Sequence, residues 1–171
     1  YIDKEGGWHS DDTLGALNFF QNKNYAEQLK KFPRITIDEE ASRGKLVLRK
    51  KGIFGKTISL DLAIPALHGS YGEDGTIQGL FEMFGVPYVG CGVAASALAM
   101  DKVLTKLLYR AQSIPTANFI FFTAHEWNRA KEKLMREAAA LRFPLFVKPV
   151  RLGSSIGISK VQNEKELAFA I

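Results

Sequence analysis

The chain has 171 residues, of which 46% are hydrophobic and 24% charged, as in globular proteins and unlike disordered or fibrous ones. A single cysteine, Cys91, excludes an internal disulfide, and no cluster of Cys and His predicts a structural zinc site. No apolar run approaches the ~20 residues that cross a bilayer, and the first residues do not resemble a signal peptide. These features predict a cytoplasmic protein of one domain or two small ones.

The net charge of +5 is concentrated in one segment. Residues 41–60 contain six basic side chains and no acid, which leaves a net charge of −1 for the rest of the chain. The segment predicts a β-hairpin around Lys51 and Gly52 whose lysines protect an exposed strand edge; an anion-binding patch is the alternative. Because the charge is local and no aromatic residues are interleaved with it, we expect neither a nucleic-acid partner nor a membrane partner.

The first half of the chain predicts a strand–helix–strand unit after a weakly helical start over residues 10–31. Its expected parts, in chain order, are a buried parallel strand over 61–67, a loop over 68–75, a helix over 76–84 and a second strand over 86–89. This order is a βαβ crossover, which favours an α/β fold with a doubly wound parallel sheet.

The second half begins with a predicted connector helix and ends with a predicted hairpin. The expected elements are a helix over 94–111, a strand over 119–122, a helix over 123–141, and antiparallel strands over 144–149 and 157–161. Thr123 and Glu126 have the spacing of a capping box, which indicates where the third of these elements begins.

The predicted hairpin places a lysine and a glycine-rich loop close together. Lys148 ends the first strand, and Gly153, Ser154 and Ser155 follow in the connection. Glycine lets backbone N–H groups face a ligand, the serines add hydroxyl donors, and lysine supplies a compact positive charge, so the combination suits a polyphosphate. The spacing is not that of a Walker A loop, and a plain turn rich in Gly and Ser is the alternative.

A second pair of cations lies in the connector helix. Lys102 and Lys106 are four residues apart on one helix face, and such a like-charge pair is unfavourable unless an anion lies against it. The alternative is a solvated face with Asp101 as a partial counter-ion.

The loop HGSYGEDG follows a predicted strand and therefore lies at the end of the sheet where open α/β folds bind ligands. Asp74 is suited to cap the following helix, and Glu73 gains from the positive helix end. His68 is either a structural histidine or a donor to a substrate carboxylate or a forming oxyanion.

Three segments in this order closely resemble the D-alanine–D-alanine ligase family of the ATP-grasp superfamily. They are HGSYGEDGTIQGLFE, VPYVGCGVAASALAMDKVLTK and FPLFVKPVRLGSSIGISKV. The resemblance extends from residue 63 to about residue 166 and is looser before it. It implies an amino-terminal doubly wound α/β substrate domain over residues 1–92, followed by the first part of an ATP-grasp α+β domain over 93–171.

The resemblance implies ATP-dependent ligation of two D-alanines for peptidoglycan synthesis. In this family ATP phosphorylates the carboxylate of the first D-alanine, and the amine of the second attacks the acylphosphate. A D-alanine–D-lactate or D-alanine–D-serine ligase is the near alternative. A non-catalytic nucleotide-binding protein on a decayed ligase scaffold is an alternative of another class.

The resemblance also implies roles for residues around the nucleotide. Lys102 and Lys148 resemble the two lysines that hold ATP phosphates. Gly153, Ser154 and Ser155 resemble the flexible loop that closes over the terminal phosphate, and Ser154 is also the loop serine near the substrate amine, a catalytic position.

Other implied parts concern the amino-acid substrates and the metal. His68 and Glu73 resemble residues that line the D-alanine pocket, with the glutamate supporting rather than reacting. The resemblance assigns the Mg²⁺ ligands and a phosphate-stabilising arginine to a region after Ile171, so we expect no metal ligand in this chain. We therefore expect a fragment that is inactive alone, and the resemblance is compatible with a homodimer.

Overall fold

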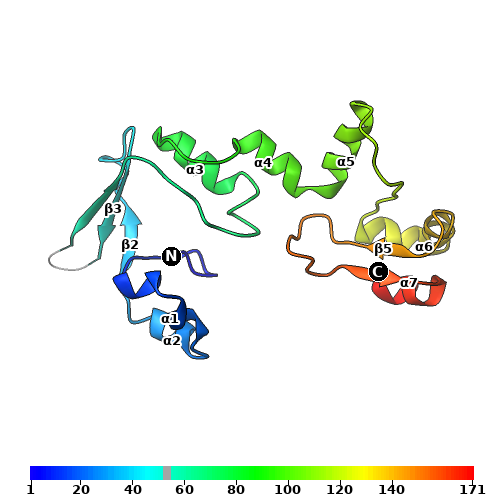
Figure 1. Cartoon of the computed structure of the whole chain (residues 1–171), viewed down its shortest axis with the longest axis horizontal. Coiled ribbons are helices and arrows are strands. Elements are labelled where there is room, and N and C mark those ends of the chain that lie inside the picture. Colours follow the sequence, from blue (N-terminus) through cyan, green and yellow to red (C-terminus); the bar gives the residue numbers. More distant parts are fainter. Residues whose placement is uncertain (52–54) are drawn as a thin grey trace. The chain divides into compact units, whose positions relative to one another are not determined.

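The computed structural model describes residues 1–51 and 55–171, which form two compact units. The first unit contains residues 1–65 and 78–90, and the second contains residues 66–77 and 91–171. The elements, labelled in Figure 1, are β1 (Trp8–His9), the 3-10 helix η1 (Asp12–Gly15), α1 (Leu17–Gln21), α2 (Tyr25–Leu29), β2 (Arg34–Ile37), β3 (Leu46–Lys50), β4 (Thr57–Leu60), α3 (Thr76–Phe84), α4 (Val93–Met100), α5 (Lys102–Ala111), α6 (Ala124–Ala139), β5 (Leu145–Val147), β6 (Ser159–Val161) and α7 (Glu164–Ala170).

The first unit contains an antiparallel sheet in the order β1-β2-β3-β4. The inner strand β3 supplies the buried Leu46, Val47 and Leu48, and Leu46 is completely inaccessible. These three consecutive residues are buried, whereas Arg49 at the basic end of the strand is exposed. The antiparallel β3–β4 pairing confirms the predicted hairpin strands, whereas Gly52 of the predicted turn lies outside the described residues.

The weakly helical region over residues 10–31 forms three short helices rather than one continuous helix. Asp11 caps η1 through its side chain, and Asn22 and Asn24 separate α1 from α2. Aspartate and asparagine favour caps and turns over helix interiors, which explains the interruptions. Phe19 and Leu29 are buried from this region.

The predicted parallel crossover is present as a single bridge between Ala63 and Tyr88, with the predicted helix α3 between them. The Ala63 N–H donates to the Pro87 carbonyl, and the Val89 N–H donates to the Ala63 carbonyl, both at 2.9 Å. The longer strands expected on either side are not formed, and Ile64 is 73% exposed. Pro65 and Pro87 have no N–H to donate, which ends the ladder.

The expected helix over residues 94–111 is broken at Asp101 into α4 and α5 (Figure 1). The Asp101 backbone is extended, and its carboxylate accepts hydrogen bonds from the Val103 and Leu104 N–H groups, each at 3.0 Å. An aspartate in this position is a strong N-cap, so the side chain begins a second helix in place of continuing the first.

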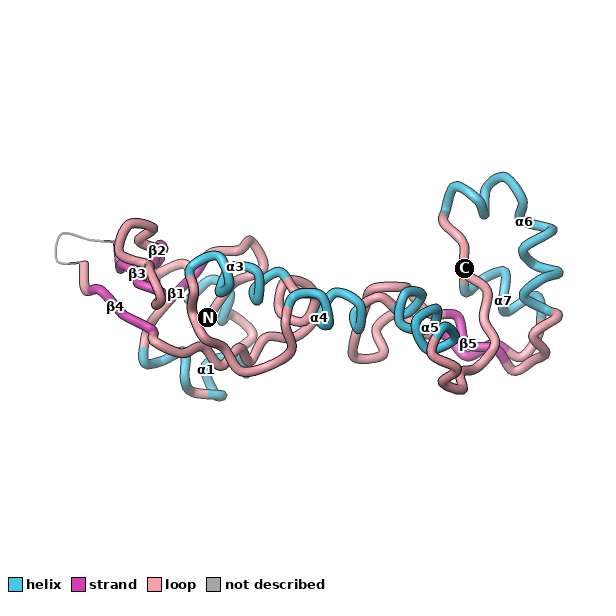
Figure 2. The backbone as a smooth tube through the Cα atoms, turned by 90° about the horizontal axis from the view of Figure 1, so that it is seen from above, coloured by secondary structure: helices cyan, strands magenta, loops and turns pink. Residues whose placement is uncertain are grey.

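The second unit ends in a helix–hairpin–helix segment. Figure 2 shows α7 beside α6, and β5 pairs with β6 in antiparallel register, which confirms the predicted hairpin. The capping box of Thr123 and Glu126 is present at the start of α6. Ala138, Val161 and Leu167 form the buried core of this segment.

Residues 119–122, expected as a strand, form a loop. Their aromatic rings stack instead on one another and on α6: Phe122 lies 5.4 Å from the Trp127 ring centre. Within the described parts of the chain, no helix is both long and apolar enough to cross a membrane.

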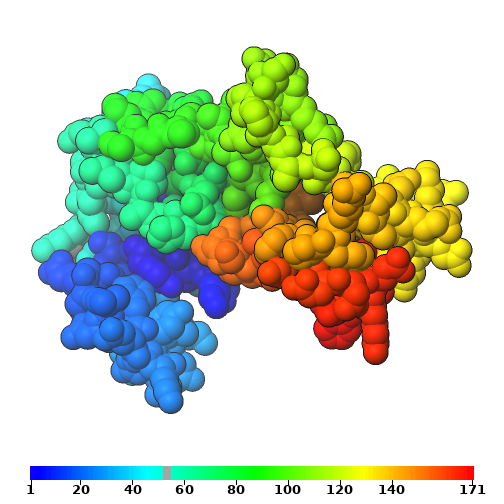
Figure 3. Space-filling view, turned by 45° about the vertical axis from the view of Figure 1, so that its right-hand side comes forward, coloured from blue at the N-terminus to red at the C-terminus, as the bar shows by residue number. Residues whose placement is uncertain are grey.

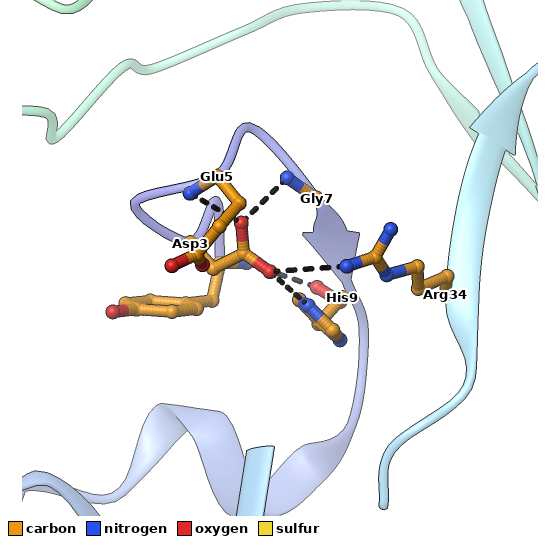
Figure 4. Close-up of polar contacts among 6 residues, drawn as sticks. Asp3, Glu5, Gly7, His9 and Arg34 are labelled. Atoms are coloured by element: carbon orange, nitrogen blue, oxygen red, sulfur yellow. Dashed lines mark hydrogen bonds and ion pairs between the residues drawn. The ribbon is translucent and has the colours of Figure 1, made fainter. Parts of the chain in front are cut away.

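A carboxylate organises the first turn of the first unit (Figure 4). Asp3 Oδ1 accepts from the Glu5 and Gly7 N–H groups, at 3.0 and 2.6 Å, and Oδ2 lies 2.8 Å from Nε2 of the buried His9. Burial pushes the pKa of Asp3 upward, but the hydrogen bonds from His9, Gly7 and Glu5 outweigh it and hold that pKa below its ordinary value.

Replacing Asp3 with asparagine is expected to destabilise the protein at neutral pH by about 1–2 kcal/mol, because the charged acceptor is lost. A carboxyl whose pKa is lowered by folding stabilises above its ordinary pKa of about 3.9, and this contribution disappears as the pH falls through the lower folded value. Urea unfolding at pH 7 and pH 3 should therefore show a difference from the parent that shrinks at pH 3. The exposed Asp12 supplies the control substitution to asparagine. An equal loss at both pH values would contradict the account.

Candidate functional site

The loop over residues 68–75 is fixed by its own acidic side chains. The Asp74 carboxylate accepts from the N–H groups of Tyr71, at 2.9 Å, and Thr76, at 3.1 Å, so it caps the start of α3 as predicted. Burial raises the pKa of Asp74, but the hydrogen bond from Tyr71 and those from Thr76 more than offset this and leave the pKa lowered. Glu73 accepts from the Gly69 N–H and thereby closes the beginning of the loop.

The start of α5 is joined to the glycine-rich loop by two neighbouring residues. The Lys102 N–H donates to the Val150 carbonyl at 3.1 Å, and its ammonium donates to the Leu152 carbonyl at 2.6 Å. Asp101, which is 6% exposed, accepts from Arg151 Nε at 3.0 Å. The pKa of the Asp101 carboxyl is lowered, chiefly by the hydrogen bond from the Leu104 N–H and further by Arg151 and the Val103 N–H. Together these outweigh burial, which raises this pKa.

The tip of the glycine-rich loop is a pair of tight turns between β5 and β6. The Ile156 N–H donates to the Gly153 carbonyl at 3.0 Å, and Ser154 and Ser155 both have left-handed backbone, with φ of 51° and 59°. Such values are uncommon outside glycine, so the turn holds the two serines in a specific presentation. Both are exposed, and the loop lies in the orange surface stretch of Figure 3.

The loop over residues 68–75 and the glycine-rich loop meet at Glu73 and Gly153. A Cβ placed on Gly153 would lie 3.8 Å from Glu73 Oε2, which is ordinary van der Waals contact. The second unit therefore brings together Glu73, the start of α5 and the glycine-rich loop. His68 is exposed at the beginning of its loop and forms no hydrogen bond with any residue that the structure describes.

Lys106 and Arg110 form a cationic group around the Phe119 ring. The half-buried Lys106 donates to the Ala117 carbonyl at 3.0 Å and lies 4.9 Å from the Phe119 ring centre, and the Arg110 guanidinium lies 4.2 Å from the same centre. Burial, followed by the charges of Lys148 and Arg110, lowers the pKa of Lys106. Lys106 thus lies near enough to Lys148 for the two charges to interact, and it remains four residues from Lys102 in α5.

Lys148 follows β5 and is exposed, with its ammonium 5.7 Å from the Phe146 ring centre. In residues 1–51 and 55–171, Lys106, Arg110 and Lys148 have no carboxylate within ion-pair distance. Uncompensated cations around a half-buried lysine are an arrangement that favours an anion.

Residue types alone did not identify Asp101 and Arg151 as partners. Fifty positions separate them, and no local spacing rule connects residues so far apart. The available signal was the single acid directly before Lys102, which the sequence indicated only as a partial counter-ion.

The described residues contain no group of three or more His, Cys, Asp or Glu side chains that fits a metal ion. The acids near the loop are each engaged otherwise: Asp74 and Asp101 cap helices, and Glu73 accepts from a backbone N–H. The Mg²⁺ implied by the sequence resemblance therefore has no ligand set assigned here.

Comparison with known families decides the membership of the chain. Residues 1–91 match the model of the D-ala D-ala ligase N-terminus, and residues 108–171 match the model of the D-ala D-ala ligase C-terminus. The chain belongs to the D-alanine–D-alanine ligase family. The predicted resemblance and the mixed α/β fold class of this ligase family are thereby confirmed.

Individual ligases align along the whole chain. The D-alanine–D-alanine ligase of Chlorobaculum tepidum is 42% identical over 180 aligned positions, which cover 100% of this chain and 47% of the relative. Among solved structures, the D-alanine–D-alanine ligase of Helicobacter pylori has a TM-score of 0.74 at 29% identity. The VanG D-Ala:D-Ser ligase of Enterococcus faecalis has the same TM-score of 0.74 at 36% identity. Each structural match covers 99% of this chain and 47% of the other, so the chain spans about half the length of these ligases.

Proposed function

We propose that this chain is part of an ATP-dependent ligase that joins two D-alanines through an acylphosphate, for peptidoglycan precursors in the cytoplasm. The observation that carries the proposal is the contact of three separate sequence segments in the second unit. Lys102 bonds the carbonyl of Leu152, and Glu73 lies against Gly153. Membership of the ligase family supports the same reaction.

The phosphate side of the reaction is proposed to use lysines and loop donors. Phosphoryl transfer needs positioned positive charge and backbone N–H groups more than covalent chemistry. Lys148 and Lys102 would neutralise the phosphates, and Ser154 and Ser155 would donate to the terminal phosphate while the loop excludes water. Lys106 adds charge on the side of Lys148. Mg²⁺ is proposed to accompany ATP on family grounds alone.

The amino-acid side is proposed to use His68 and Glu73, with Ser154 near the substrate amine. An exposed His68 has both ring nitrogens available for a substrate carboxylate. Glu73, held by the Gly69 N–H beside Gly153, would shape the pocket without reacting.

Ligation of D-alanine to D-serine is the second candidate, because a solved D-Ala:D-Ser ligase is 36% identical to this chain. The experiment supplies the full-length protein with ATP, Mg²⁺ and D-alanine, and adds D-serine and D-lactate as competitors, with products identified by mass spectrometry. The expected product is D-alanyl-D-alanine. A mixed product in excess would select the alternative, and ATP consumption without any D-alanyl product would overturn the proposal.

A further inference from the structure

The glycine-rich loop is anchored at its base and exposed at its tip. Its base residues Val150, Arg151 and Leu152 all contact the start of α5, through Lys102 or Asp101. The tip residues Ser154 and Ser155 are exposed, and the backbone hydrogen bonds across the tip close local turns. On the β5 side, movement of the tip is therefore limited by these three residues that contact α5.

Arg151 is the one side chain of the base that reaches across to α5. Its partner Asp101 is buried and immobilised by two backbone N–H groups, so it provides a fixed anchor. Arg151 itself is 77% exposed, and without it the buried Asp101 carboxylate still accepts from the Val103 and Leu104 N–H groups, so the pair should contribute little to global stability. A fixed acid with a solvent-facing arginine suits orientation of the loop rather than support of the core.

We propose that Arg151 is a positioning residue that sets the orientation of the Ser154–Ser155 tip relative to α5, through its ion pair with Asp101. The inference rests on the proposed function of the loop in closing over the phosphates. Catalysis depends steeply on such geometry, and a displacement of about 1 Å at a positioned group costs on the order of 100-fold in rate.

The test compares three single variants of the full-length protein. Arg151→Gln removes the charge, Arg151→Lys keeps it, and Lys133→Gln removes a matched cation, since Lys133 also forms an exposed ion pair, with Glu137 on α6 at 3.7 Å. We expect Arg151→Gln to lower kcat about 10-fold with a smaller change in the KM for ATP, Arg151→Lys to recover part of the rate, and Lys133→Gln to match the parent.

Two further readouts separate positioning from folding and from the function itself. Amide hydrogen exchange without ligand should be faster over residues 153–158 in Arg151→Gln, with an unchanged melting temperature. Combining Arg151→Gln with alanine at Ser154 and Ser155 should give less than the sum of the separate losses, because both changes act on the same loop.

The outcomes are distinct for each claim. The positioning role is overturned if Arg151→Gln has the kcat and the loop exchange of the parent. It is also overturned if Arg151→Lys loses as much kcat as Arg151→Gln and the losses from Arg151→Gln and the serine changes are strictly additive. A parent protein that forms no D-alanyl product overturns the proposed function, while loop exchange still reports on whether Arg151 holds the tip.

Discussion

Replacing Lys148 with alanine in the full-length protein is expected to weaken ATP binding about 10- to 100-fold. A charge-assisted hydrogen bond contributes about 1.5–3 kcal/mol, which corresponds to that change in the dissociation constant. The side chain is exposed and has no carboxylate partner among the described residues, so its removal should leave the fold intact. Calorimetric titration with ATP measures the effect directly.

Lys131→Ala is the matched control for this experiment. Lys131 also lies over an aromatic ring in the second unit, 5.4 Å from the Trp127 ring centre, compared with 5.7 Å for Lys148 and Phe146. It should bind ATP like the parent. Equal affinities for the parent and Lys148→Ala would remove the phosphate role assigned to this lysine.

Replacing Gly75 with alanine is expected to destabilise the protein by about 3 kcal/mol. The backbone has φ of +92°, which side chains other than glycine rarely adopt, and a Cβ would lie 2.8 Å from the Val93 carbonyl oxygen. Strain and overpacking each cost about 1–3 kcal/mol. Because the loop that bears Glu73 would have to move away from α4, substrate affinity should fall together with the unfolding midpoint.

Gly69→Ala separates backbone strain from overpacking against Val93 as causes of the destabilisation. Gly69 also has a positive φ, of +72°, but a Cβ there would meet nothing within 4 Å. Gly69→Ala should thus lose less stability than Gly75→Ala, about 1–2 kcal/mol from backbone strain alone. Urea unfolding of both variants measures the difference, and equal losses would show that the contact with Val93 is not limiting.

Local sequence rules predicted the elements whose signals are local. The capping box of Thr123 placed the start of α6, and apolar runs around a glycine-rich connection placed β5 and β6. The same rules overextended the parallel strands, because they weigh apolar character and not the missing N–H groups of Pro65 and Pro87. They also passed over Asp101, whose capping bonds break one helix into two.

The candidate site shows the same division between local and distant information. Motifs identified Lys102, Lys148, Ser154 and Ser155 as individual residues. Contacts that join segments 50 positions apart, such as Asp101 with Arg151, follow only from the fold. The contacts of Lys106 with the Phe119 ring and the Ala117 carbonyl are likewise tertiary, and no local spacing rule predicts them.

The glycine-rich loop, Lys102 and Lys148 are proposed to hold the phosphates of one nucleotide. A crystal structure of the full-length protein with a non-hydrolysable ATP analogue tests this proposal most directly. We expect phosphate oxygens within about 3 Å of the Lys148 ammonium and of backbone N–H groups in residues 153–155. A nucleotide bound elsewhere, with Lys148 and the loop making no contact to its phosphates, would contradict it.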